Sequence, residues 1–231
     1  MGLFNFFRKN NPKENILDDL YSGLEIIADS SYSIFLHSFN LDKRAFGEAT
    51  RFETCVAAFF YIDYCMSENI SENIRKNFYE LAKVKIIERF SNKLSNTDLS
   101  DIIDYRLDEY SKIAMEMGRD WRESFNNLYE VNLKGTENTD NIKKLPGLKY
   151  EGAFEQMPKK LFFIMLEVGS IYKAAKLVKE LFAGKSLHSI IQGIEEIDSK
   201  LAKELIAGKG LRSIMQGIEE ITRNGRNWFK N

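Results

Sequence analysis

Cysteine, histidine and proline are scarce in this 231-residue chain, which has two, two and three of them. Two cysteines and two histidines are too few for most zinc, haem and iron–sulfur sites. Three prolines leave little room for an all-β fold that is rich in tight turns. An excess of one charge is also lacking, since 33 Lys and Arg residues nearly balance 34 Asp and Glu residues. This balance excludes a protein built around a global basic field.

The two cysteines, Cys55 and Cys65, lie in a segment that is predicted to be a single helix. A helix rises about 1.5 Å per residue, so the two sulfur atoms would lie about 15 Å apart and could not bond to each other. We therefore expect two reduced thiols and a reducing, cytoplasmic compartment. A run of about 20 apolar residues, which a membrane-spanning helix needs, is also lacking.

Residues 1–11 form a short apolar and basic tail. Its apolar residues precede its charges: Leu3, Phe4, Phe6, Phe7, then Arg8 and Lys9. This order and the short apolar part argue against a signal peptide. Residues 3–9 could contact a membrane surface or a partner. The simpler interpretation is a tail that packs on its own domain or has no fixed structure.

Apolar residues recur at every third or fourth position almost everywhere, and this spacing predicts an all-α fold. Helices are expected over four ranges in the first part of the chain: 12–39, 42–66, 72–94 and 99–128. The second helix is apolar on nearly every side between Cys55 and Met66, which is typical of a central helix surrounded by others. Residues 12–130 are therefore predicted to form an antiparallel bundle of about four long helices.

The pattern changes over residues 131–157, which are polar, rich in turn-forming residues and without an apolar stripe. A stretch of this kind is typical of a functional loop or a linker. Helical spacing resumes over residues 158–231, where three further helices are expected. These helices either complete the bundle as one domain or form a small satellite.

The unusual feature of the sequence is a tandem duplication at its C-terminal end. Residues 176–197 recur 24 positions later as residues 200–221, and 17 of the 23 positions from Ala175 and from Ser199 onward are identical. At about 100° per residue, the apolar stripes of the two copies would face about 120° apart on one continuous helix. Separate helices are therefore predicted, over 186–207 and 210–224.

Glycines mark the expected ends of these helices, because glycine accepts the left-handed conformation that terminates a helix. Gly184 precedes the first of them, and Gly208 occupies the same place one copy later. The two helices are expected to fold as an antiparallel hairpin.

Each copy carries an apolar stripe with a small residue in its middle. The residues are Leu187, Ile190, Gly193 and Ile194 in the first copy and Leu211, Ile214, Gly217 and Ile218 in the second. The small residue permits close approach of a second helix, within the chain or between chains. Our leading hypothesis is a non-enzymatic interaction or assembly protein that uses these helices to bind itself or a protein partner.

A candidate polar site lies on the helix that is expected to be most buried, at Glu48, Arg51, Glu53 and Asp63. A buried carboxylate must be paired or protonated. A structural ion pair, for example of Arg51 with a neighbour, accounts for these residues, and the alternative is an enzyme or a metal-binding bundle. A membrane-associated protein held by residues 3–9 is the third hypothesis.

Other motifs fail on inspection. Gly184-Lys185-Ser186 resembles the end of a phosphate-binding loop, but Lys179 stands where that loop needs glycine. Neither histidine follows a glutamate at the spacing of a di-iron bundle. Three acids share one face of the fourth helix (Asp101, Asp104 and Asp108), which is typical of a solvated face near a helix N-terminus. The alternative is that this face, like the carboxylates of the second helix, serves an enzyme or a metal-binding bundle, since stacked carboxylates can hold magnesium when another helix supplies partners. We therefore expect no catalytic residue, cofactor or metal, and the charge balance disfavours a nucleic acid partner.

Overall fold

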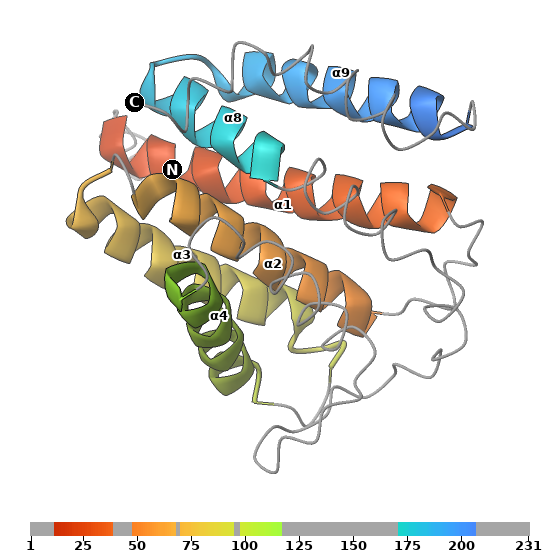
Figure 1. Ribbon diagram of the computed structural model, residues 1–231. Coiled ribbons are helices and arrows are strands. Elements are labelled where there is room, and N and C mark those ends of the chain that lie inside the picture. The colour runs from red at the N-terminus through yellow and green to blue at the C-terminus, as the bar shows by residue number, and fades with distance from the viewer. Residues whose placement is uncertain (1–11, 39–47, 68–69, 95–97, 117–170, 207–231) are drawn as a thin grey trace, which may run out of the picture.

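The computed structural model describes residues 12–38, 48–67, 70–94, 98–116 and 171–206. Within these ranges the chain forms six helices and no strand, and the predicted all-α class is confirmed (Figure 1). No helix in this part of the chain is long and apolar enough to cross a membrane.

The helices agree with the spacing of apolar residues where both can be compared. Their bounds are α1 Pro12–Ser38, α2 Glu48–Ser67, α3 Glu72–Phe90, α4 Leu99–Glu116, α8 Tyr172–Phe182 and α9 Leu187–Ile206. The expected range of α1 is confirmed. The expected starts and ends over 42–47, 117–128 and 207–224 lie outside the described residues.

One helix ends earlier than its apolar pattern predicts. α3 stops at Phe90 and not near Leu94, because the backbone N–H groups of Lys93 and Leu94 both donate to the carbonyl of Phe90 and close a turn. Leu94 is still buried, so it continues the apolar stripe beyond the end of the helix. Apolar spacing alone therefore extends the helix by about one turn.

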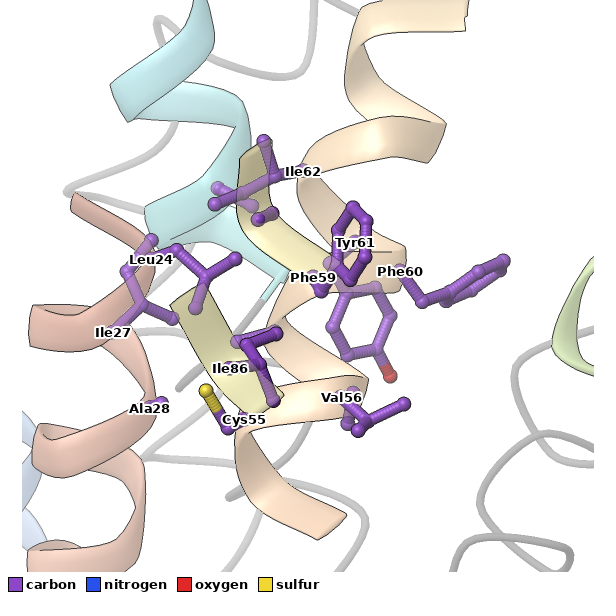
Figure 2. Close-up of a cluster of buried hydrophobic side chains, with 14 of the residues drawn as sticks. Leu24, Ile27, Ala28, Cys55, Val56, Phe59, Phe60, Tyr61, Ile62 and Ile86 are labelled. Carbon is purple, nitrogen blue, oxygen red and sulfur yellow. The ribbon is translucent and has the colours of Figure 1, made fainter. Parts of the chain in front are cut away.

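α2 lies at the centre of the described core. All eleven residues from Phe52 to Ile62 are buried, and α1, α3, α4 and α8 pack against this helix. Figure 2 shows its side chains meeting Leu24 and Ile27 of α1 and Ile86 of α3. Burial of apolar side chains on every side of α2 is the main source of stability, at about 1.5–3 kcal/mol for each large residue.

Aromatic rings connect α2 to its neighbours. Phe59 meets Phe78 of α3 edge to face, with ring centroids 5.6 Å apart. Phe52 meets Phe90 at the other end of α3, at 5.5 Å. Edge-to-face pairs add about 0.5–1.5 kcal/mol beyond the area that they bury, so they fix the rotation of α3 against α2.

The C-terminal helices pack on the other side of α1. α8 contacts α1 and α2, and α9 contacts α1 and α8 (Figure 1). A glycine lets α8 approach α1 closely, because a Cβ atom at Gly23 would lie 2.4 Å from a methyl group of Leu177. Leu177 is fully buried in this contact, and α1, α2, α8 and α9 share one apolar core.

α8 ends at the glycine that the sequence indicates. Gly184 has a φ of 82°, in the left-handed region. Its N–H donates to the carbonyl of Leu181, and the N–H of Lys185 donates to the carbonyl of Glu180. These two bonds form a Schellman cap, which satisfies carbonyl groups at the end of the helix. The predicted helix stop at Gly184 is confirmed.

A Gly184→Ala variant should be less stable than the wild type by about 1–2 kcal/mol, because a Cβ atom is strained in the left-handed conformation. Space is not the cause, since no atom lies within 4 Å of the place where the Cβ would be. Urea unfolding followed by circular dichroism measures the loss. Ser189→Ala, at an exposed position of α9, is the control and should cost nothing. Equal stability of the two variants would contradict the assigned conformation.

Candidate functional site

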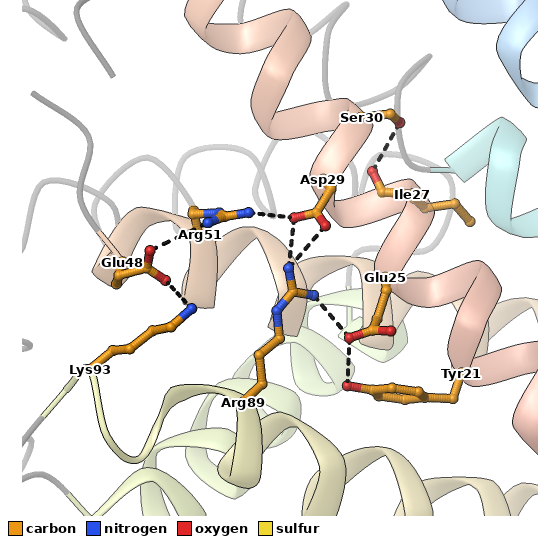
Figure 3. A network of polar contacts seen from close by, with 9 residues as sticks. All are labelled: Tyr21, Glu25, Ile27, Asp29, Ser30, Glu48, Arg51, Arg89 and Lys93. Atoms are coloured by element: carbon orange, nitrogen blue, oxygen red, sulfur yellow. Dashed lines mark hydrogen bonds and ion pairs between the residues drawn. The ribbon is translucent and has the colours of Figure 1, made fainter. Parts of the chain in front are cut away.

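The first candidate residues, Glu48 and Arg51, belong to a network of ion pairs that joins α1, α2 and α3 (Figure 3). Arg51 donates to Glu48 at 3.3 Å and to Asp29 of α1 at 3.2 Å. Lys93, just beyond α3, contacts the other oxygen of Glu48 at 3.1 Å. The ion pair that the sequence suggested for Arg51 is therefore present, with two acids.

Arg89 of α3 is the centre of the same network. It donates to both carboxylate oxygens of Asp29, at 2.8 and 2.9 Å, and to Glu25 at 3.2 Å. Burial opposes the charge of Arg89, but the hydrogen bond and the negative charge of Asp29 outweigh burial, and the pKa of Arg89 is raised. Three acids and three bases balance one another here, so the network holds three helices in register without a net charge.

Glu53 and Asp63 lie elsewhere on α2 and have other partners. Glu53 is fully buried and accepts from Arg106 of α4 at 3.3 Å. Asp63 accepts two hydrogen bonds from Arg75 of α3, at 3.2 and 2.9 Å. These two acids are ten positions apart, which corresponds to about 15 Å along the helix. Different cations therefore hold them in two separate places.

The structure does not bring the four candidate polar residues into one site. Glu48 pairs with Arg51 and with Lys93 beyond α3, and Arg51 also pairs with Asp29 of α1. Glu53 pairs with α4 and Asp63 with α3. Each carboxylate faces a cation, and most of these cations come from another helix, so this arrangement suits the joining of helices. Among the described residues, no group of three or more His, Cys, Asp or Glu side chains could hold a metal ion.

The acids on α4 also have ordinary partners. Asp104 accepts from the Tyr79 hydroxyl at 2.7 Å and from Lys83 at 2.6 Å, and both donors belong to α3. Asp108 pairs with Lys112 one turn later, at 2.5 Å. This face of α4 therefore carries ion pairs to α3 and along its own helix.

The second candidate region is the first copy of the duplicated segment, which the chain docks on its own core. Ile190 and Ile194 are fully buried, and Leu187 packs against the same core. We call the parts of α1 and α8 that contact α9 the α9 docking surface. The sequence left open whether this apolar stripe meets a helix of the same chain or of another chain. The first copy meets helices of the same chain. The second copy, with Leu211, Ile214, Gly217 and Ile218, lies outside the described residues.

The glycine in the middle of α9 gives room to a lysine. A Cβ atom at Gly193 would lie 2.5 Å from Cε of Lys176, so the glycine leaves room for the end of the Lys176 side chain at this point of α9. Lys176 then reaches Glu180 at 3.0 Å, and Lys185 reaches the same carboxylate at 3.2 Å. These three charges clamp the turn between α8 and α9, and the second copy has identical residues in all three places.

Lys173, a buried lysine at the junction of α1, α8 and α9, was not predicted from the sequence. Lys173 is completely buried; its Nζ pairs with Asp198 of α9 and donates to the hydroxyl of Ser30 on α1, at 2.7 Å in the latter case. Burial lowers the pKa of Lys173, and Asp198 opposes this shift. The signal in the sequence is its position four residues before Leu177, which places Lys173 on the apolar face of α8.

Comparison with known proteins does not identify these residues. No family model, no curated protein and no solved structure matches it. Function is therefore inferred from the chain's own contacts.

Removing the cation that faces Glu53 should destabilise the protein strongly. Arg106→Met leaves a fully buried carboxylate without this cation and should cost about 3–5 kcal/mol, whereas Glu53→Met with Arg106→Met should recover most of the loss. Urea unfolding of both variants measures the difference. Lys112→Met, which breaks an exposed pair, is the control and should cost under about 1 kcal/mol. A double variant as unstable as the single one would contradict a structural pair.

The charge clamp of the turn should weaken in acid. Burial favours the neutral form of Glu180, but hydrogen bonds from Lys176 and Lys185 outweigh burial, and the pKa of Glu180 is lowered. Its contribution is present above its ordinary pKa and is lost as the pH falls through the lowered value. Glu180→Gln should therefore cost about 0.5–1 kcal/mol at neutral pH.

The stabilities of wild type and Glu180→Gln should converge as the pH falls below the ordinary pKa of a glutamate, about 4.3. Unfolding by urea at a series of pH values measures the difference. A constant difference from neutral to acidic pH would show that the carboxylate charge plays no part in the clamp.

Proposed function

We propose that this protein is a non-enzymatic helical assembly protein that associates with itself or a protein partner through its duplicated C-terminal helices. The docking of the first copy supports this proposal most directly. Ile190 and Ile194 have an exposed fraction of 0%. They belong to α9, which packs against α1 and α8. The duplicated sequence therefore has the pattern of a helix that docks on other helices.

The differences between the two copies leave this docking stripe intact. From Leu187 to Ile197 only two positions differ: His188 becomes Arg212 and Ile191 becomes Met215. In the first copy His188 is exposed and Ile191 is half-buried, whereas the fully buried isoleucines recur unchanged. The second copy thus keeps the residues that make the contact and varies only those around it.

The second copy has an apolar stripe whose burial would be favourable. Its four stripe residues are Leu211, Ile214, Ile218 and Ile221. Each such side chain gains about 1.5–3 kcal/mol when it is fully buried. An apolar helix surface, in a second molecule of this chain or in a protein partner, is the kind of surface that such a stripe binds.

The finer architecture and the location belong to the same proposal. In it, residues 12–130 form an antiparallel bundle, residues 158–231 add three helices with the tandem duplication, and the protein works in the cytoplasm. The contacts of α8 and α9 with α1 support the architecture, and Cys55 and Cys65, which form no disulfide, support the location. The partner is a protein and not a nucleic acid.

The other two hypotheses gain no support from the described residues. The carboxylates considered for an enzyme or a metal-binding bundle each face a cation from another helix or from their own. The tail considered for membrane contact, residues 3–9, lies outside the described part of the chain.

Size-exclusion chromatography with light scattering tests the proposal for self-association. The full chain should have a mass above the 26.8 kDa of one molecule. Ile214→Glu with Ile218→Glu should return it to one molecule, because two charges in the stripe prevent its burial. Gln216→Glu is the matched control and should change nothing, since its counterpart Gln192 is exposed.

A chain that ends at Ile206 gives a second control, because it keeps every described helix. It should be folded and monomeric. An oligomer that persists in this shortened chain, or in Ile214→Glu with Ile218→Glu, would contradict association through the second copy.

A further inference from the structure

Two nearly identical segments of one chain carry the apolar residues that α9 buries on its docking surface. The residues that α9 buries there in its first half, Ile190 and Ile194, recur as Ile214 and Ile218. The glycine that makes room for Lys176 recurs as Gly217. Apolar contacts and the shape of the helix therefore do not distinguish the two copies, and another feature must decide which one docks.

The ion pair at Lys173 is the contact that the duplication does not repeat. Asp198 follows the first copy directly, and the residue 24 positions later is Thr222. Lys173 precedes the copied segment, and its own counterpart is Ile197. With the second copy on the docking surface, Lys173 would face a hydroxyl group and not a carboxylate.

Lys173 cannot turn to water for compensation. Its side chain is completely buried, and its Nζ lies between Asp198 and the hydroxyl of Ser30, which itself donates to the carbonyl of Ile27 on α1 at 3.3 Å. A chain of polar contacts thus runs from α9 through α8 into α1. A buried cation that loses its carboxylate retains the full cost of its desolvation.

We infer that the α9 docking surface is a binding site for either copy of the duplicated segment, and that the Lys173–Asp198 ion pair reserves it for the first. This inference goes beyond the proposed function, because it concerns which copy docks within the chain and not what the other copy binds. A polar pair in an apolar contact selects one register among several that apolar residues alone would allow.

The length of the connection also favours the first copy, but less strongly. Docking of residues 211–221 would replace the four-residue connection 183–186 by residues 183–210. The longer loop disfavours the second copy by about 20-fold. Breaking a buried ion pair costs on the order of 100-fold or more. Transfer of the acid from one copy to the other should therefore reverse the choice.

Cross-linking can report which copy is docked. Lys176→Cys with Gly193→Cys reports the first copy, because the Lys176 side chain crosses α9 at Gly193. Lys176→Cys with Gly217→Cys reports the second. A short bismaleimide is the reagent, in a Cys65→Ser background. Cys55 can stay, since it is fully buried and burial raises its pKa to about 12.

With the native Asp198 and Thr222, the first reporter pair should cross-link and the second should not. With Asp198→Thr and Thr222→Asp together, the second pair should exceed the first. Lys176→Cys with Gln216→Cys is the matched control and should stay low in both backgrounds, because its counterpart Gln192 is exposed. Predominance of the first pair after the exchange of residues 198 and 222 would overturn the inference.

Lys173→Met keeps the test decisive if the exchanged variant loses its helical circular dichroism. Without the buried cation, only the connection favours the first copy, and Asp198 is left without its partner, so the second pair should rise to at least about one twentieth of the first. Undetectable cross-linking of the second pair in Lys173→Met would also overturn the inference. Both results are read on cross-linked single chains, so they are independent of the oligomeric mass that tests the proposed function.

Discussion

The burial of α2 on all sides is the constraint on which the rest of the described structure depends. A helix with eleven consecutive buried residues cannot leave any face to water, so α1, α3, α4 and α8 must cover it together. Glu53 lies within this stretch, and its burial requires the cation that Arg106 supplies from α4. The position of α4 is therefore set by a charge as well as by apolar contacts. α8 then completes the cover of α2 and presents part of the surface on which α9 docks.

Polar contacts between helices fix the register that apolar packing leaves loose. Asp29 meets Arg51 and Arg89, and these three residues come from α1, α2 and α3. Many side-chain arrangements bury a similar apolar area, whereas a two-pronged contact such as that of Arg75 with Asp63, in which two nitrogens each meet one carboxylate oxygen, has one geometry. The acids that stand out on α2 in the sequence thus act as joints between helices. This role explains why they are spread along the helix and do not converge.

The sequence was sufficient for those features that depend on local chemistry. The range of α1 follows from apolar spacing, and the end of α8 follows from Gly184, because both are decided by residues within a few positions. The partners of the paired acids were beyond reach, since Arg106 lies 53 positions from Glu53 and Arg89 lies 60 positions from Asp29. Sequence indicates that a buried acid needs a cation, but the choice among 33 Lys and Arg residues depends on how the helices pack. Lys173 was missed for the same reason, because its acid lies on another helix.

The two halves of the copied segment have diverged in different ways, and this difference bears on what the second copy can do. In the half that forms α8, the buried Val178 and Ala175 correspond to Ala202 and Ser199, so the second copy offers less apolar volume there. In the half that begins α9, the buried isoleucines are unchanged. Loss of two methyl groups at a buried position is unfavourable by roughly 1 kcal/mol or more for each methylene equivalent. The second copy is thus a poor substitute for α8, whereas it keeps the two isoleucines that α9 buries. A segment that keeps only its docking stripe is suited to bind a helix surface that another part of the protein, or another molecule, provides.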